Sequence, residues 1–132
     1  MPSPIRVGLI GAGYIADWHA TALKATKGVR ITAICDRNAA AAHPLAEAHG
    51  AQVFTSVPDL IASGTCDAVH ILTPPDLHRD IAVECLSGGL HVLVEKPVGL
   101  SVAEVEAIET TAQSSGKSFI AGHNFLGLPR YL

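Results

Sequence analysis

The sequence predicts an α/β fold, a doubly wound parallel sheet with helices on both faces. Strand-like apolar runs alternate with amphipathic helical stretches along the chain, and a glycine-rich turn follows the first apolar run. Such alternation is typical of parallel sheets, because each crossover between parallel strands needs room for a helix. The 132 residues, 48% of them hydrophobic, suffice for one domain with a substantial core.

The first apolar run is followed at once by a Gly-x-Gly-x-x-Ala motif. Gly11 permits the tight turn out of the strand, Gly13 lets the backbone approach a pyrophosphate, and Ala16 allows close packing of helix on sheet. The helix is expected to begin near Tyr14, so the N–H groups of Tyr14 and Ile15 lie at its positive end, where phosphates bind. We expect a larger side chain at position 13 to abolish binding by sterics alone.

The second apolar run, residues 29–35, ends in Asp36, about twenty residues beyond the glycine motif. A carboxylate there can accept hydrogen bonds from the adenosine ribose, each worth roughly 1.5–3 kcal/mol. It would also repel a 2′-phosphate, so NAD is favoured over NADP. Arg37 offers the opposite interpretation, because a guanidinium can pair with a 2′-phosphate or stack on adenine. Asn38 is expected to cap the next helix.

The remaining elements follow from the same alternation and from signals at helix ends. A helix over residues 38–49 should end at Gly50, and Pro44 should kink or restart it. Ser56 should cap a short helix, and Ser101 should open the last helix in a capping box with Glu104. Six strands joined by helical crossovers match the Rossmann order 3-2-1-4-5-6. The predicted strands are residues 7–10, 29–35, 52–55, 67–72, 91–94 and 118–122.

Composition excludes several classes of partner. The net charge is −3 and the nine Lys and Arg are scattered, which argues against nucleic acid and membrane surfaces. No apolar run is long enough for a membrane span and no signal peptide is recognisable, so we expect a cytoplasmic protein. The seven histidines are dispersed, which predicts no metal site. The cysteines are far apart and predicted to be buried free thiols, at positions 35, 66 and 85.

Polar residues gather at the carboxyl ends of the last three strands, where such sheets bind ligands. They are Thr73, Pro74, Pro75, His78, Glu95, Lys96, His123 and Asn124. The sequences ILTPPDLH at 71–78, GLHVLVEKP at 89–97 and GHN at 122–124 resemble the N-terminal domain of the Gfo/Idh/MocA oxidoreductases, named for glucose-fructose oxidoreductase and inositol dehydrogenase. The resemblance covers nearly the whole chain.

This resemblance implies an enzyme that uses NAD or NADP to oxidise or reduce a carbon of a sugar, amino sugar or cyclitol. Lys96 matches the family's catalytic lysine, near the nicotinamide ribose and the reacting hydroxyl, although it would otherwise read as a turn lysine paired with Glu95. His78 is either near the cofactor or a structural hydrogen-bond donor, and His19 is expected to pack and bind no ligand. The other implied cofactor contacts are Thr73, Pro74, Glu95, His123 and Asn124.

Members of the family continue into a second, α+β domain that carries the substrate contacts and the general acid/base, and this sequence lacks it. We therefore assign residues 1–122 to the dinucleotide-binding domain and residues 123–132 to the start of a linker. The chain alone is predicted to be inactive, and self-association is left open. A stand-alone nucleotide-binding or redox-sensing module is the alternative, but it has no use for Lys96. An S-adenosylmethionine methyltransferase would not explain the Glu-Lys-Pro sequence.

Overall fold

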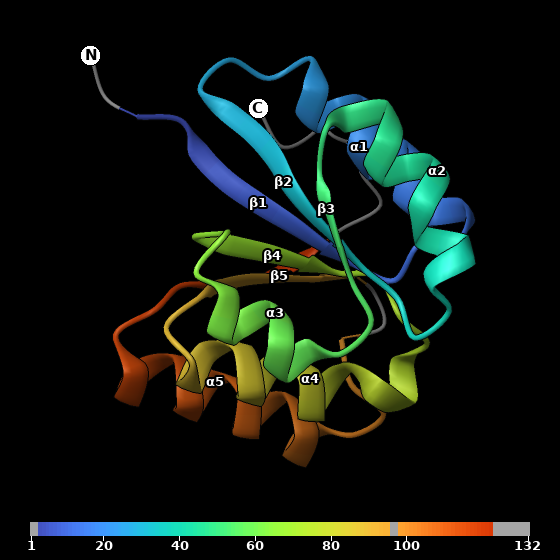
Figure 1. Cartoon of the computed structure of the whole chain (residues 1–132). Helices are drawn as coiled ribbons and strands as arrows, with labels where there is room; N and C mark the ends of the chain where they lie inside the picture. Colours follow the sequence, from blue (N-terminus) through green and yellow to red (C-terminus); the bar gives the residue numbers. More distant parts are fainter. Residues whose placement is uncertain (1–2, 96–97, 123–132) are drawn as a thin grey trace.

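The six strands form one parallel sheet in the order β3-β2-β1-β4-β5-β6, as predicted. Figure 1 shows this sheet in a computed structural model that describes residues 3–95 and 98–122. The chain starts in the middle of the sheet and turns back after β3, so the crossovers change face there. The strands are β1 (Ile5–Ile10), β2 (Val29–Cys35), β3 (Gln52–Phe54), β4 (Ala68–Ile71), β5 (His91–Glu95) and β6 (Phe119–Gly122).

Helices cover both faces of the sheet. Helices α1 and α2 lie on one face, and α3, α4 and α5 lie on the other (Figure 1). The gap between the carboxyl ends of β1 and β4, where the strand order reverses, is the usual ligand crevice of such sheets. The helices are α1 (Tyr14–Lys24), α2 (Ala39–His49), α3 (Val57–Ser63), α4 (His78–Ser87) and α5 (Val102–Ser115), with a short 3₁₀ helix η1 (Pro75–Leu77) before α4.

Each face of the sheet has its own apolar core. Leu9 and Ile34 pack with α1 and α2, and Ala16 is fully buried among them, as close helix packing requires. Val69 and Ile71 pack with α3, α4 and α5 on the other side. The second core also holds the three cysteines, which are free and buried, as predicted (Cys35, Cys66 and Cys85). Burial raises the pKa of all three thiols, to about 11 for Cys35 and about 12 for Cys85.

The predicted helix caps are present, with one difference in the last. The side chains of Asn38 and Ser56 accept hydrogen bonds from backbone N–H groups in the first turns of α2 and α3. Oγ of Ser101 accepts from the N–H of Glu104 at 3.2 Å. Oε1 of Glu104, however, accepts from the N–H of Leu100, one residue earlier than a standard capping box predicts.

Of the two effects expected at Pro44, a kink or a restart of the helix, the restart is wrong. Helix α2 runs without interruption from Ala39 to His49, and Gly50 ends it with a φ of 65°. Pro44 and Ala40 both lie on the solvent side of the helix. Since Pro44 has no N–H for the carbonyl of Ala40, that oxygen is left to water, and the helix continues.

Candidate dinucleotide-binding site

Gly11 makes the sharp turn at the end of β1. Its φ is 101°, a left-handed conformation that side chains disfavour, and its N–H donates to the carbonyl of Cys35 at 2.7 Å. A Cβ atom here would lie 3.0 Å from the carbonyl carbon of Leu72 and 3.2 Å from the nitrogen of Thr73. The fold itself therefore requires glycine at this position.

Gly13 is different, because the fold does not require it. It is the N-cap of α1, with a φ of −81° that any residue can adopt, and it makes no side-chain cap. A Cβ atom at this position would meet none of the described residues, 3–95 and 98–122, within 4 Å. The space beside Gly13 thus lies open at the positive end of α1, where Tyr14 is exposed and Ile15 is half-buried. An anionic group fits this space only if residue 13 stays small.

Asp36 is fixed at the end of β2 by backbone hydrogen bonds. Its Oδ2 accepts from the N–H of Ala12 at 2.9 Å, and its Oδ1 accepts from the N–H of Asn38 at 2.9 Å. Its own N–H donates to the carbonyl of Phe54 on β3 at 3.0 Å. Each carboxylate oxygen still has a free lone pair. The group is therefore held beside the glycine-rich turn and can accept further hydrogen bonds.

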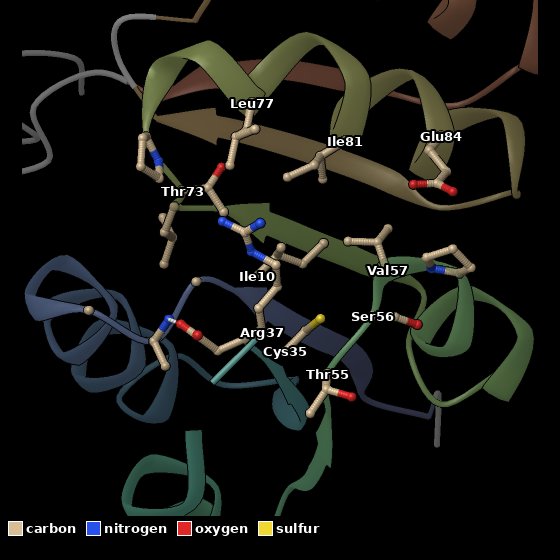
Figure 2. A pocket seen from close by; sticks show the side chains of 17 residues that line it. Ile10, Cys35, Arg37, Thr55, Ser56, Val57, Thr73, Leu77, Ile81 and Glu84 are labelled. Atoms are coloured by element: carbon tan, nitrogen blue, oxygen red, sulfur yellow. Dashed lines mark hydrogen bonds between the residues drawn. The ribbon is translucent and has the colours of Figure 1, made fainter. Parts of the chain in front are cut away.

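A cavity of about 580 Å³ connects the glycine-rich turn with Asp36. Figure 2 shows Arg37 extending into it from the end of β2, with Leu77 and Ile81 directed into it from the opposite wall. Thr73 and Pro74, in the loop after β4, also line it, and their contact with a cofactor stays a prediction. The sequence did not predict the cavity-lining residues that lie at the end of β3 and the start of α3, nor most of those on η1 and α4. These residues are Thr55, Ser56, Val57, Pro58, Leu77, Ile81 and Glu84.

A hydrogen bond from the side chain of His78 fixes the backbone of the loop after β4. This side chain is 1% exposed, and its Nε2–H donates to the carbonyl of Thr73 at 2.7 Å. Oγ1 of Thr73 is buried and has no hydrogen-bond partner among residues 3–95 and 98–122. Buried hydroxyl groups are rarely left unpaired, so Thr73 offers a polar contact at the cavity wall. A contact between His78 and a cofactor stays a prediction.

Glu95 belongs to a second polar cluster, at the end of β5. Nε2 of His19, on α1, lies 3.0 Å from Oε2 of Glu95, and Nδ1 of His19 lies 2.8 Å from Nδ1 of His70 on β4. The two rings meet edge to face, with centroids 5.0 Å apart. Burial lowers the pKa of His70 to about 4, with a further contribution from His19. Burial also lowers the pKa of His19, although Glu95 opposes this effect.

Three predicted site residues, Lys96, His123 and Asn124, lie outside the described residues. Within the described part of the chain, no group of three or more His, Cys, Asp or Glu side chains is placed to hold a metal ion. In the same residues, no helix combines the length and the apolar character needed to cross a membrane.

The strand order, the glycine-rich turn and the acid at the end of β2 together define a Rossmann domain of the dinucleotide-binding type. The chain belongs to the Gfo/Idh/MocA family, whose sequence model, described as "Oxidoreductase family, NAD-binding Rossmann fold", matches residues 5–123.

Similar proteins include dehydrogenases of several kinds. The chain is 35% identical over 120 residues to a 4-carboxy-2-hydroxymuconate-6-semialdehyde dehydrogenase of Sphingobium sp., which covers 90% of this chain and 38% of that protein. It is 41% identical over 100 residues to an inositol 2-dehydrogenase of Corynebacterium glutamicum, covering 74% and 30% respectively. The chain therefore spans about a third of the length of these relatives.

Solved structures show the same fold. The WlbA dehydrogenase from Bordetella pertussis, in complex with NADH and UDP-GlcNAcA, superposes with a TM-score of 0.88 at 30% identity. The matched region covers 92% of this chain and 36% of that one. GenD2 from gentamicin A biosynthesis, in complex with NAD, gives a TM-score of 0.89 at 31% identity, with coverage of 96% and 36%.

Proposed function

We propose that this chain is the NAD-binding half of an oxidoreductase that transfers hydride between nicotinamide and a carbon of a sugar, amino sugar or cyclitol. The observation that carries the proposal is the pairing of an open helix N-terminus at Gly13 with the fixed carboxylate of Asp36 across one cavity. The relatives whose names include inositol 2-dehydrogenase support the class of substrate.

The residues present fit a dinucleotide. The space at Gly13 suits the pyrophosphate, the carboxylate of Asp36 suits the adenosine ribose, and the unpaired Oγ1 of Thr73 supplies a hydrogen bond beside them. The bound nicotinamide supplies the chemistry of hydride transfer. Because Asp36 is acidic, NAD is favoured over NADP, while Arg37 in the cavity wall stacks on the adenine.

The catalytic part of the proposal assigns Lys96 to the substrate side. An ammonium group there lowers the energy of negative charge that develops on the reacting hydroxyl oxygen. Residues 1–122 bind the cofactor, and residues 123–132 begin the connection to a domain that supplies the acid/base and the substrate contacts. The chain by itself binds the dinucleotide without turnover. The alternative, a stand-alone nucleotide-binding module without catalysis, would behave in the same way in this respect.

Isothermal titration calorimetry on the purified chain tests the proposal. We expect saturable binding of NADH with a stoichiometry of one, weaker binding of NADPH, and none of S-adenosylmethionine. Gly13→Val should abolish NADH binding because its side chain fills the open space, whereas Gln113→Ala, an exposed change on α5, should not. Binding of S-adenosylmethionine in preference to NADH would contradict the proposal, as would tight NADH binding by Gly13→Val.

A further inference from the structure

His19 joins two parts of the fold that are far apart in the sequence. It lies on α1, the helix that begins at the glycine-rich turn, and its side chain is 7% exposed. Its ring contacts His70, 51 positions away on β4, and Glu95, 76 positions away on β5. Glu95 is the last residue of β5 and directly precedes Lys96. The imidazole therefore ties the helix at the phosphate end of the site to the strand that leads to Lys96.

The chemistry of the three groups gives the hydrogen bonds a direction. A carboxylate only accepts hydrogen bonds, so Nε2–H of His19 donates to Oε2 of Glu95. In neutral His19 the other ring nitrogen then has a lone pair, and Nδ1–H of His70 donates to it. His70 thus fixes both the tautomer and the rotation of the His19 ring.

Glu95 depends on this ring for its position. Its side chain is only 18% exposed, so its carboxylate needs a partner in place of water. Val92 and Val94, on the opposite face of β5, are buried in the core beneath α4 and α5, which leaves Glu95 directed towards α1. Without the imidazole, the carboxylate would turn to solvent or to another cation.

We propose that His19 is a positioning residue for the nicotinamide half of the cofactor, because it holds Glu95 and thereby the end of β5 next to Lys96. This inference rests on the proposed function. The adenosine half depends on other residues, since the cavity beside Asp36 and Arg37 is not lined by His19, His70 or Glu95. A defect at His19 should therefore affect NADH and leave ADP-ribose, which lacks the nicotinamide, unaffected.

The experiment compares the affinities of NADH and ADP-ribose for the same folded chain. In His19→Leu, which loses the hydrogen bonds to Glu95 and His70, we expect NADH affinity to fall by about tenfold, as for the loss of one hydrogen bond to a charged group. ADP-ribose affinity should change by less than about twofold, because its contacts are remote. His19→Gln keeps an amide N–H that can donate to Glu95, and it should restore most of the NADH affinity.

Controls separate positioning from a general loss of structure. His91→Leu removes an imidazole at the other end of β5, where Nδ1 of His91 accepts from the N–H of Ser118 at 2.9 Å, and it should leave the ratio of the two affinities unchanged. If His19→Leu fails to fold, as judged by circular dichroism, His70→Leu takes its place. It keeps His19 but removes the group that orients it, so the ratio should still fall.

The outcomes are distinct. A ratio that falls in His19→Leu or His70→Leu and recovers in His19→Gln supports the inference. An unchanged ratio in the folded variants, or an equal fall in His91→Leu, overturns it. If the unchanged chain binds neither ligand, the proposed function fails, and the inference fails with it.

Discussion

The carboxylate of Asp36 is bonded to the glycine-rich turn itself, through the N–H of Ala12 at 2.9 Å. The side chain proposed to select the cofactor thus also fixes the loop proposed to bind its phosphates. A change at Asp36 should therefore act on both affinity and stability.

Asp36→Ala should weaken NADH binding by roughly one to two orders of magnitude, because hydrogen bonds to a charged group are lost. The ratio of NADH to NADPH affinity should fall as well, since the repulsion of the 2′-phosphate disappears. Loss of the bonds to Ala12 and Asn38 should lower the unfolding free energy by about 1–3 kcal/mol. Calorimetry with both cofactors and urea unfolding measure these effects. Equal or tighter NADPH binding by the unchanged chain would contradict the role of Asp36.

Alanine at Gly11 should lower stability, whereas alanine at Gly13 should weaken only cofactor binding. Gly11→Ala places a Cβ atom 3.0 Å from backbone atoms at a φ of 101°, so the unfolding free energy should fall by about 1–3 kcal/mol or more. The Cβ atom of Gly13→Ala meets no atom in the described part of the chain, so this change should leave stability unchanged while it weakens NADH binding. Thermal unfolding and calorimetry on both variants provide the comparison. A destabilised Gly13→Ala would show that this glycine is structural after all.

Stability should fall as the pH is lowered from about 6.5 to about 4. The pKa of His70 is about 4 in the folded chain and about 6.5 when unfolded, so the unfolded state binds more protons in this window. The stabilisation is complete above pH 6.5 and lost towards pH 4, and amounts to about 3 kcal/mol. The pKa of His19 is lowered too, which acts in the same direction.

Urea unfolding across this pH range measures the loss. His70→Leu should flatten the dependence, whereas His43→Gln, at an exposed position on α2, should not. An unaltered profile in His70→Leu would mean that other groups carry the acid sensitivity.

The chain alone should bind the cofactor, but with NAD present it should not oxidise myo-inositol, glucose or amino sugars. General acid/base groups contribute factors on the order of 10² to 10⁴ to such reactions, and the chain spans about a third of its relatives. NADH absorbance after addition of NAD and substrate is the measurement. Steady NADH formation that Lys96→Ala eliminates would refute this expectation and make His78 or His123 a candidate base.

Local sequence signals predicted the strand order and named six residues that line the cavity, which are Gly11, Gly13, Asp36, Arg37, Thr73 and Pro74. Gly11, Gly13 and Asp36 could be identified because their roles depend on one strand, one turn and one helix end. The restart expected at Pro44 failed because the sequence does not show that Pro44 and Ala40 both face solvent.

The rest of the cavity depends on contacts between segments that are distant in the sequence. Thr55, directly after β3, and Ile81, on α4, are far apart in the sequence, and they line the same cavity only because the fold brings these two segments together. His19 was predicted to pack, and it is buried, but no local pattern indicates that its ring meets His70 and Glu95.

The three cysteines have a practical consequence for anyone who handles this protein. Only the thiolate reacts with alkylating reagents, and Cys85 is fully buried with a pKa near 12. A thiol reagent in excess therefore modifies Cys85 only while the core around α4 is open, and the rate of modification of Cys85 counts these opening events. Because a bound ligand makes such events rarer, slower labelling in the presence of NADH would report cofactor binding without any engineered probe.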